Sequence, residues 1–384
     1  GDCKFTAVTI GAGNHLDLDG ERIETSGAVD INGTLNFGGA GSLFIAGDTL
    51  DLTNGTMDEE AGASIICTGN AKILYPNAAS FVGDNTTNIM FNGDYDCYNS
   101  TQYLGNYIFG SGKSDFKGSA QQATNITVAS GATFDSEENA ITLKGDLTTS
   151  GGLIGKSALT LSSSVDNDSV NVPNDNTLDF TTAMTMEGWV KTTGTDSFQH
   201  IVCKSGGFYF ITLYNAGSGP KAMARIYEGA NIDAIGTTTL NDGKWHHVAA
   251  TYSTSAGKLL LYVDGKLEAS TDNSDAITAS ATPLFLGSND ATTNELTGTL
   301  ARASVWNVAL TQAQIREMMF YDFATADASG TIPDANCVGW WQFDEGTGTD
   351  VADSSASNND GTIGTPTWAG AGTFTYGTST LVMS

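Results

Sequence analysis

The stretch LNDGKWHHVAATYSTSAGKLLLYVDGKLEAS, residues 240–270, decides the fold of the second half of the chain. Its first part follows the turn pair Asp242-Gly243 and is rich in aromatic and β-branched residues, which predicts a strand over 242–252. Its second part alternates side chains up to Asp264-Gly265, a pair that favours the two-residue turn of a β-hairpin. We therefore predict successive antiparallel strands joined by tight turns.

The adjacent pair His246 and His247 raises the question of a metal or catalytic site, because the chain has only four histidines. Successive side chains of a strand point to opposite faces, so one ion cannot easily reach both rings. A metal site also needs three or four convergent ligands. We therefore predict that this pair belongs to the fold, and not to a metal or catalytic centre.

The composition indicates an all-β protein. The chain has 384 residues, 46 of them Gly, and its short apolar runs are broken by Thr, Ser, Asn and Asp. This length has room for two or three domains, each with its own core. The residues 311–318, in which Thr311 and Gln314 form a capping box ahead of Ile315 and Met318, predict one short amphipathic helix.

The formal net charge of −27 argues against nucleic acid and anionic membranes as partners, because both would be repelled. The sequence contains no apolar run of about 20 residues, so we predict no membrane span. The chain begins without Met or an apolar leader, which we expect of a processed product or a shortened chain. The five cysteines (Cys3, Cys67, Cys97, Cys203 and Cys337) lack C-x-x-C spacing, and we predict mostly buried free thiols.

A repeat occupies the first part of the chain. Gly27, Gly41, Gly55 and Gly69 are spaced by fourteen residues, and each interval holds two short alternating strands. On this spacing, Val29 and Ile31 correspond to Leu43 and Ile45, and Leu35 and Phe37 to Leu50 and Leu52. The pattern predicts a β-solenoid or a stacked-hairpin stalk, built either by a single chain or by an oligomeric fibre.

The predicted domains are a β-repeat stalk over 1–156, a β-sandwich over 157–369 and a return to the stalk over 370–384. Within the stalk, Phe and Tyr are dense among Asn and Gly over 76–114, which predicts an interruption. Those aromatic residues either contact sugars or a partner, or form a local core. Alternation resumes over 124–154, and GTFTYGTSTLVMS (372–384) is similar to another stalk turn.

Residues 157–369 resemble the laminin G-like (concanavalin A-like) jelly-roll family. The resemblance rests on several stretches in order: SVNVPNDNTLDF (169–180), MTMEGWVKT (184–192), the hairpin at 240–270, TPLFLGS (282–288) and LTGTLARASVWNVALTQAQIREM (296–318). It implies an antiparallel β-sandwich. It also implies a lectin-like domain that binds carbohydrate, although the loops that set specificity vary within the family.

The segment CVGWWQFDEGTGTDVADSSASNNDGTIG (337–364) looks like the part that in this family precedes the first core strand, yet here it follows the last one. We infer a circular permutation, since the ends of a sandwich often lie close together. The strand around 340–343 is then expected to pair with the strand around 300–306. The jelly roll becomes an insertion into the stalk.

The motifs of the main hydrolases are missing from the sequence. There is no E-x-D-x-x-E and no G-x-S-x-G, Asp344 and Glu345 are adjacent and should diverge, and neither His15 nor His200 has a catalytic motif around it. We therefore expect no enzymatic activity. Trp189, Trp306 and Trp340 are expected in the core, whereas Trp368, beside Gly-rich sequence, is the candidate for contact with a ligand.

Calcium is the candidate cofactor. The loop DVADSSASNNDG (350–361) is rich in the oxygen ligands that calcium takes, and the family resemblance nominates Asp353, Asn358 and Asp360. Asx turns made by the same side chains are the alternative explanation.

These features favour a structural fibre or decoration protein of a virus particle, most of all of a bacteriophage. Its lectin-like domain would attach to glycans on the host surface. The expected partners are other virion proteins and copies of the same chain, with a trimer favoured because three chains can close a prism without sheet edges. A secreted bacterial cell-surface adhesin is the second hypothesis. A polysaccharide-degrading enzyme is the third.

Overall fold

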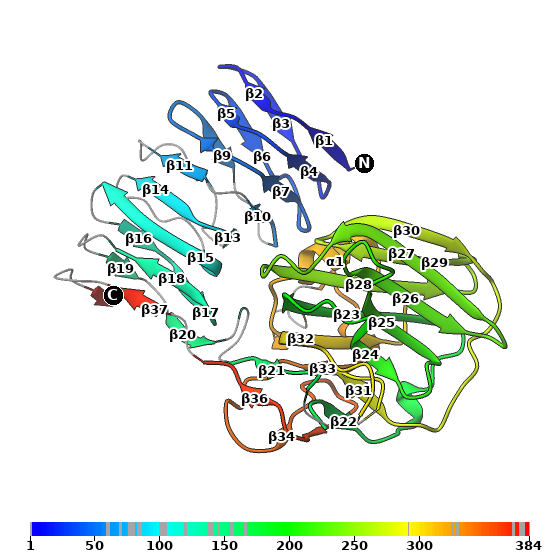
Figure 1. The fold of residues 1–384 in the computed structure, drawn as a ribbon. Coiled ribbons are helices and arrows are strands. Elements are labelled where there is room, and N and C mark those ends of the chain that lie inside the picture. The colour runs from blue at the N-terminus through cyan, green and yellow to red at the C-terminus, as the bar shows by residue number, and fades with distance from the viewer. Residues whose placement is uncertain are drawn as a thin grey trace. The chain divides into compact units, whose positions relative to one another are not determined.

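The chain divides into two compact units. The first contains residues 1–153, 316–320 and 370–384, and the second contains residues 154–315 and 321–369. A computed structural model defines residues 2–58, 62–68, 71–75, 81–82, 87–99, 106–118, 121–136, 141–143, 146–151, 153, 157–164, 167–290, 292–324, 326, 330–370, 373–375 and 381–383. Figure 1 shows short stacked strands in the first unit and longer strands in the second.

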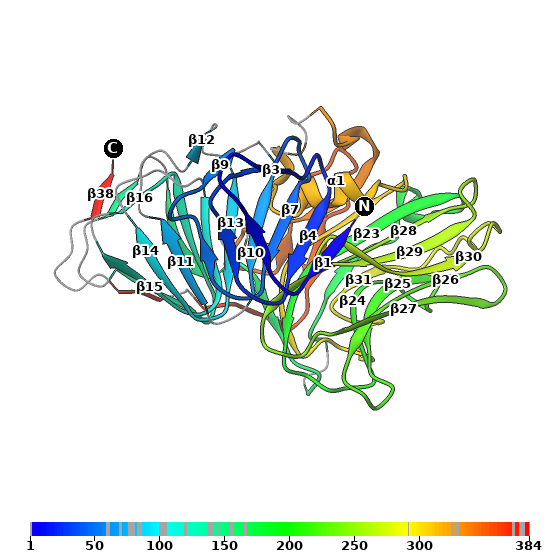
Figure 2. The ribbon, with the colours of Figure 1, turned by 90° about the horizontal axis from the view of Figure 1, so that it is seen from above.

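The first unit is a β-solenoid whose strands stack into parallel sheets, as Figure 2 shows for β4, β7, β10 and β13. One sheet contains β1 (Cys3–Phe5), β4 (Arg22–Thr25), β7 (Leu43–Ala46), β10 (Ser64–Cys67), β13 (Asn88–Asn92), β15 (Asn106–Gly118), β17 (Asn125–Ala129) and β20 (Leu147–Gly151). The next contains β2 (Val8–Ile10), β5 (Val29–Ile31), β8 (Leu50–Asp51), β11 (Ala71–Tyr75), β14 (Tyr95–Asn99), the second part of β15, β18 (Ala132–Asp135) and β37 (Thr373–Thr375).

Two shorter sheets complete the solenoid. One contains β3 (His15–Asp17), β6 (Thr34–Asn36), β9 (Thr56–Asp58) and β12 (Phe81–Val82), and the other contains β16 (Gln121–Ala123), β19 (Ile141–Leu143) and β38 (Leu381–Met383). Every described stalk strand pairs in parallel with another strand of the same chain. A hairpin stack would require antiparallel pairs, so the solenoid alternative is confirmed.

One solenoid turn is longer than the fourteen-residue glycine spacing. Arg22 lies opposite Leu43 and Leu43 lies opposite Ser64, so a turn takes 21 residues at this level. Val29 pairs with Leu50, and the predicted equivalence of Val29 with Leu43 is wrong. Each turn here holds three short strands, so a step of fourteen residues moves two strands along the same turn instead of one turn up the stack.

Gly55 shows why glycine marks the corners. A Cβ atom at this position would lie 2.1 Å from the carbonyl oxygen of Ile31 in the turn below. Any other residue would therefore push two stacked turns apart. The repeated glycines mark places where two turns approach closely. Their spacing therefore predicts the length of a turn less well than the register of strand pairing does.

Aromatic side chains fill part of the solenoid interior. Phe91, Phe109 and Phe134 form a stack with ring centroids 5.1 and 4.5 Å apart. Tyr95 and Tyr107 are also buried. The described part of 76–114 thus continues the solenoid, and these aromatic residues form its core; residues 76–80, 83–86 and 100–105 lie outside the described residues.

The chain returns to the solenoid near its end, as predicted. Strand β37 pairs with β18, placing Phe374 opposite Phe134, and β38 pairs with β19, placing Val382 opposite Thr142. The second unit is therefore inserted between two strands that belong to one stack.

The second unit is a sandwich of two antiparallel sheets. The first, sheet E, has the order β30 (Lys266–Asp272), β29 (Lys258–Val263), β28 (Trp245–Ser253), β23 (Ala183–Thr192), β32 (Gly298–Trp306), β21 (Leu159–Leu161) and β36 (Thr367–Trp368), with β33 (Cys337–Trp341) also on β32. The second, sheet F, has the order β27 (Asn231–Thr239), β26 (Lys221–Tyr227), β25 (Tyr209–Tyr214), β24 (Phe198–Lys204), β31 (Leu284–Leu286), β22 (Val170–Val172), β35 (Gly361–Ile363) and β34 (Asp350–Val351).

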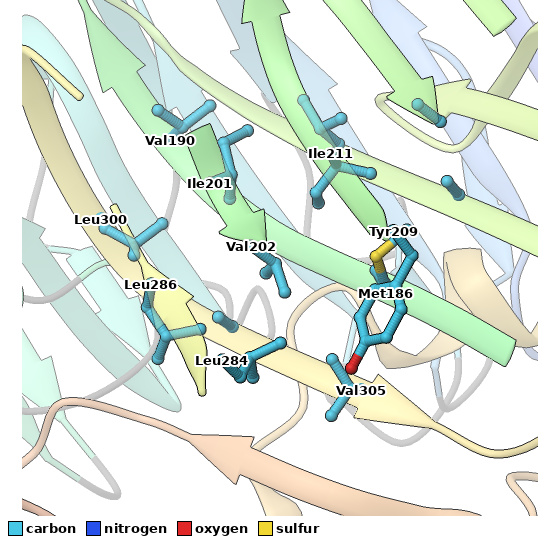
Figure 3. Close-up of a cluster of buried hydrophobic side chains, with 14 of the residues drawn as sticks. Met186, Val190, Ile201, Val202, Tyr209, Ile211, Leu284, Leu286, Leu300 and Val305 are labelled. Atoms are coloured by element: carbon cyan, nitrogen blue, oxygen red, sulfur yellow. The ribbon is translucent and has the colours of Figure 1, made fainter. Parts of the chain in front are cut away.

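Alternate residues of both sheets form one apolar core, shown in part in Figure 3. Met186 and Val305 of sheet E meet Tyr209, Ile211 and other apolar residues of sheet F. Each buried side chain of this size stabilises the fold by about 1.5–3 kcal/mol relative to exposure. The all-β expectation and the jelly-roll expectation are both confirmed.

The segment after the last family strand folds back into the same sandwich. Trp340 lies opposite Ser304 and Trp341 opposite Ala303, so β33 pairs with β32 as the permutation predicts. Strands β34 and β35 join sheet F, and β36 joins sheet E.

Local sequence signals are found in the expected places. Asp264 and Gly265 both have positive φ, at 47° and 67°, and form the two-residue turn between β29 and β30. Helix α1 (Gln312–Met318) begins with the predicted capping box, in which the Thr311 amide donates to Gln314 Oε1 at 2.9 Å. Two 3-10 turns occur at Asn176–Leu178 and Asp334–Asn336.

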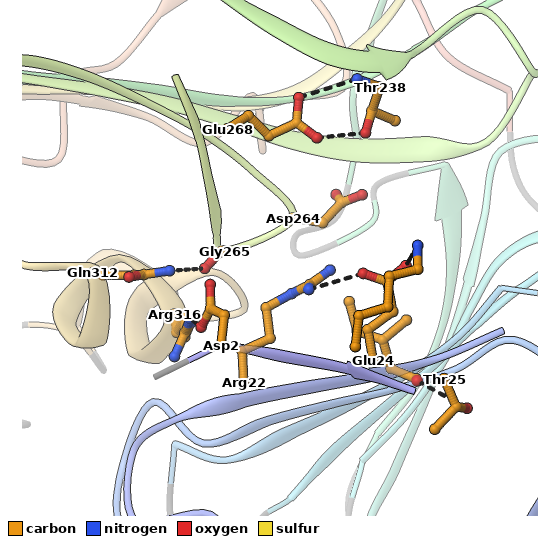
Figure 4. Close-up of polar contacts among 12 residues, drawn as sticks. Asp2, Arg22, Glu24, Thr25, Thr238, Asp264, Gly265, Glu268, Gln312 and Arg316 are labelled. Atoms are coloured by element: carbon orange, nitrogen blue, oxygen red, sulfur yellow. Dashed lines mark hydrogen bonds and ion pairs between the residues drawn. The ribbon is translucent and has the colours of Figure 1, made fainter. Parts of the chain in front are cut away.

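A carboxylate links one edge of sheet E to sheet F. Glu268 of β30 accepts hydrogen bonds from the Thr237 and Thr238 amides of β27, at 2.8 and 3.1 Å. Figure 4 shows its contacts with Thr238. These amides have no ladder partner in the register of β26 and β27. Glu268 therefore satisfies backbone donors at the place where the two strands diverge.

The thiols agree with the prediction in part. Cys67, Cys203 and Cys337 are free and buried, whereas Cys3 is free and exposed; the side chain of Cys97 lies outside the described residues. Within the described ranges, no helix combines the length and hydropathy needed to cross a membrane.

Candidate functional site

The two adjacent histidines lie on opposite faces of β28, as the strand parity predicts. His247 is fully buried and its Nε2 donates to Glu187 Oε2 at 2.8 Å. Arg302 donates to both oxygens of Glu187 at 3.1 and 2.8 Å, and Ser304 donates to Oε1 at 2.5 Å. Burial opposes ionisation of Glu187, but Arg302 and His247 lower its pKa to about 2. These four side chains form an internal network, and all of them are buried.

His246 lies between two carboxylates. Its Nδ1 is 2.9 Å from Asp264 Oδ2, and its Nε2 is 3.1 Å from Asp242 Oδ1. Burial alone would lower the pKa of His246, but Asp264 and Asp242 raise it to about 10. Asp264 Oδ1 also accepts from the His247 amide at 2.9 Å, so the cationic ring ties both turn residues to the strand.

The predicted calcium loop is organised around Asp353, whose carboxylate accepts four hydrogen bonds. Oδ1 accepts from the amides of Trp340 and Ser355, both at 2.8 Å. Oδ2 accepts from Ser355 Oγ at 2.7 Å and from the Asn359 amide at 2.8 Å. The bond to Ser355 is an Asx turn, and Asp353 is buried.

The other two nominated ligands have separate roles. Asp360 Oδ1 accepts from the Asp353 amide at 2.8 Å, and Asn358 Nδ2 donates to the Ala356 carbonyl at 3.1 Å. In the described part of the chain, no group of three or more His, Cys, Asp and Glu side chains is arranged to hold a metal ion. The structure thus shows the Asx-turn arrangement at Asp353, and calcium binding stays a prediction.

Trp368 is half-buried on β36, where its Nε1 donates to the Gly348 carbonyl at 3.3 Å and its ring packs against the core. Trp189, Trp306 and Trp340 are fully buried, as predicted. Trp368 is therefore only partly accessible to a ligand.

The acidic pair Asp344 and Glu345 serves the local fold. Asp344 accepts from Gln342 Nε2 at 3.1 Å, and Glu345 accepts from the Ala352 amide at 2.8 Å.

A pocket opens on the outer face of sheet F, the face turned away from the sandwich core. We call it the His200 pocket; its volume is about 260 Å³, and it is lined by Phe198, His200, Gly206, Gly207, Phe210, Arg225, Asn289 and Asn294. The strands β24, β25 and β26 supply the side chains, and the loops after β24 and β31 supply the glycines and amides.

His200 lies between aromatic rings. Its ring centroid is 4.6 Å from that of Phe210, edge to face, and 6.3 Å from that of Phe198. The side chain is 2% exposed, and Nδ1 is buried without a hydrogen-bond partner. Burial, together with the charge of Arg225, lowers the pKa of His200 to about 3, so the ring is neutral at physiological pH.

The rest of the pocket is polar but carries no net charge. Arg225 donates to both oxygens of Asp233 at 2.6 and 2.8 Å, and its guanidinium lies 5.2 Å from the centre of the Phe210 ring. Asn289 accepts from Cys203 Sγ at 3.3 Å. An unpaired imidazole nitrogen, aromatic rings and amides around one hollow suit a ligand that presents both hydroxyl groups and apolar CH faces.

Sequence reasoning missed this pocket. The alternation in FQHIVCK (198–204) breaks at a bulge between His200 and Val202, so that Ile201 and Val202 both face the core while His200 and Cys203 face outward. The one available signal was the pairing of Arg225 with Asp233 across a hairpin.

The sequence of residues 163–316 matches the family model described as the concanavalin A-like lectin/glucanases superfamily. No curated protein matches the chain by sequence.

Solved structures resemble parts of the chain. A candidate carbohydrate-binding protein from Bacteroides ovatus is 20% identical with a TM-score of 0.46, over 59% of this chain and 62% of that one. This chain therefore covers less than two thirds of that protein. Domains LG4-5 of the mouse laminin α1 chain are 18% identical with a TM-score of 0.34, over 43% and 45%. The CBM40 domain of a Ruminococcus gnavus IT-sialidase, bound to α2,3-sialyllactose, is 15% identical with a TM-score of 0.31, over 40% and 94%.

The sheet order, the two-sheet core and the family match agree with one another. Residues 163–316 belong to the concanavalin A-like lectin/glucanases superfamily, and strands β33 to β36, which follow them in the chain, join the same two sheets.

Proposed function

We propose that the chain is a non-enzymatic attachment protein whose jelly roll binds glycans in the His200 pocket. The observation that carries this proposal is the buried, unpaired Nδ1 of His200 beside two aromatic rings. An unpaired buried acceptor or donor costs about 1–3 kcal/mol, which a sugar hydroxyl entering between the rings would recover. The aromatic faces suit the CH face of the same sugar.

The family supports a glycan ligand, because lectins and glucanases both recognise glycans. The pocket lining favours binding over hydrolysis. Glycoside hydrolysis commonly uses two carboxylates beside the scissile bond, and none of the eight residues that line the His200 pocket is Asp or Glu.

The solenoid supports a display role. Its described strands, β1 to β20 with β37 and β38, pair in parallel around one apolar interior, a rigid arrangement suited to carrying a binding domain. We propose that the protein is displayed on a virus particle, preferably a bacteriophage, and that it assembles as a homotrimer. A secreted bacterial adhesin is the alternative. Detection of the chain in regular copy number on purified particles, and its mass by light scattering, tests carrier and assembly.

Binding to a glycan array, with neutral and acidic glycans of one to six sugar residues, tests the ligand. The variants Phe198→Ala and Arg225→Gln alter the pocket, and Leu267→Ala, an exposed apolar position on sheet E, is the matched control. We expect the pocket variants to lose about tenfold in affinity while the control keeps it. Equal binding by all three proteins, or hydrolysis of any bound glycan, would contradict the proposal.

A further inference from the structure

A second pocket lies on the same face of sheet F. We call it the Asn171 pocket; its volume is about 200 Å³, and it is lined by Asn167, Ser169, Asn171, Phe285, Thr362, Ile363 and Gly364. These residues come from β22, β31 and β35 and the loops beside them.

The strand register connects the two pockets. Phe210 lies opposite Cys203, Cys203 opposite Phe285, Phe285 opposite Asn171, and Asn171 opposite Thr362. This row runs across five neighbouring strands on one face. With about 4.8 Å between strands, the backbones at Phe210 and Asn171 are about 14 Å apart, which is longer than one pyranose ring.

Neither pocket presents an unpaired charged side chain to a ligand. Asn171 and Thr362 are exposed in the second pocket and offer an amide and a hydroxyl, and none of its lining residues is ionisable. In the first pocket the charge of Arg225 is matched by the bidentate Asp233. The chain as a whole carries −27, so an acidic glycan would approach against the field of the protein.

We propose that the His200 and Asn171 pockets are two subsites of one surface that binds an uncharged oligosaccharide lying across β25, β24, β31 and β22. This inference rests on the proposed glycan function of the His200 pocket. It assigns the second subsite to Asn171 and Thr362, with the buried Phe285 lining that pocket on the side nearer to Phe210. The neutral state of the His200 imidazole fits the same ligand class.

The test compares oligomers of different length from the neutral glycan that the array binds best, measured by calorimetry on the full chain. We expect the affinity to increase from one sugar residue up to the length that fills both pockets. Asn171→Ala should lower the affinity for the long oligomer by about fivefold to tenfold and leave that for the shortest bound oligomer unchanged. Asn231→Ala, an exposed Asn on the far edge of sheet F, is the matched control.

The possible failures are distinguishable. If affinity does not depend on oligomer length, or if Asn171→Ala and Asn231→Ala behave alike while Phe198→Ala still lowers the affinity about tenfold, the second subsite is wrong and the proposed function stands. Tighter binding of acidic than of neutral glycans would overturn the ligand class. Binding of no glycan at all would overturn both proposals.

Discussion

Replacing His246 with Gln removes a positive charge from between the carboxylates of Asp242 and Asp264, which are 3.1 and 2.9 Å from its ring nitrogens. In the folded protein the ring keeps its proton up to a pKa of about 10, compared with about 6.5 in the unfolded chain. This difference corresponds to about 5 kcal/mol before screening. Asp242 is 43% exposed, so solvent screening lowers the expected contribution to about 3 kcal/mol.

The sign of the pH dependence follows from the raised pKa. The folded state binds the proton more tightly, so the stabilising contribution is complete below about pH 6.5, falls as the pH rises and is lost above about pH 10. We expect His246→Gln to be less stable than the parent protein by about 2–3 kcal/mol at pH 6, because Gln keeps one hydrogen bond but no charge. The two proteins should converge above pH 10.

Urea unfolding followed by tryptophan fluorescence at pH 6 and pH 10.5 measures this difference. All six tryptophans lie between residues 189 and 368, so the signal reports the jelly roll and not the solenoid. His15→Gln, at an exposed position of the solenoid, is the control. A stability difference that is the same at both pH values, or larger at pH 10.5, would refute the electrostatic reasoning.

Glu187→Gln leaves Arg302 buried without its carboxylate and should destabilise the jelly roll by about 3–5 kcal/mol. Glu345→Gln, at an exposed position, should change the stability little. The urea concentration at the midpoint of unfolding, followed by tryptophan fluorescence, measures both variants. Asp353→Ala removes four hydrogen bonds and should lower the free energy of unfolding by about 2–4 kcal/mol. A thermal melt of the parent protein with calcium or with chelator tests the predicted ion. Calcium that binds the folded loop would raise the melting temperature. Gly55→Ala places a Cβ against the Ile31 carbonyl and should destabilise the solenoid by about 2 kcal/mol. The midpoint of unfolding followed by circular dichroism should fall, and the midpoint followed by tryptophan fluorescence should not change. Gly370→Ala, where nothing lies within 4 Å of the added Cβ, should change neither midpoint.

The jelly roll was predictable because its signals are local. Strand parity placed His246 and His247 on opposite faces, Asp264-Gly265 specified a turn, and Thr311 with Gln314 specified a helix start. Each of these depends on residues within a few positions of one another, where propensity and geometry agree.

The solenoid was predictable in class but not in register. Alternation shows that short strands exist, yet it does not show which strands pair. Parallel pairing joins residues one turn apart, and the repeated glycines follow corner geometry, as at Gly55, more closely than turn length. The fourteen-residue period therefore identified the architecture and gave the wrong equivalence for Val29.

The His200 pocket could not be found from the sequence because its residues become neighbours only after folding. They come from three strands and two loops, and a bulge after His200 reverses the alternation that would have marked the outer face. The candidates that sequence did offer, Asp353 and Trp368, are polar or aromatic residues whose hydrogen bonds hold loops in place.

The pairing of Thr133 with Thr373 has a consequence for biosynthesis. Strands β18 and β19 leave the ribosome long before their partners β37 and β38, because the whole jelly roll is translated between them. Between each pair of strands lie 237 residues. At usual translation rates of about 5–20 residues per second, they keep these strand edges unpaired for about 12–47 s. During that interval the growing chain exposes hydrogen-bonding edges that another nascent copy could capture, so prompt folding of the inserted domain helps to keep each stalk made from its own polypeptide.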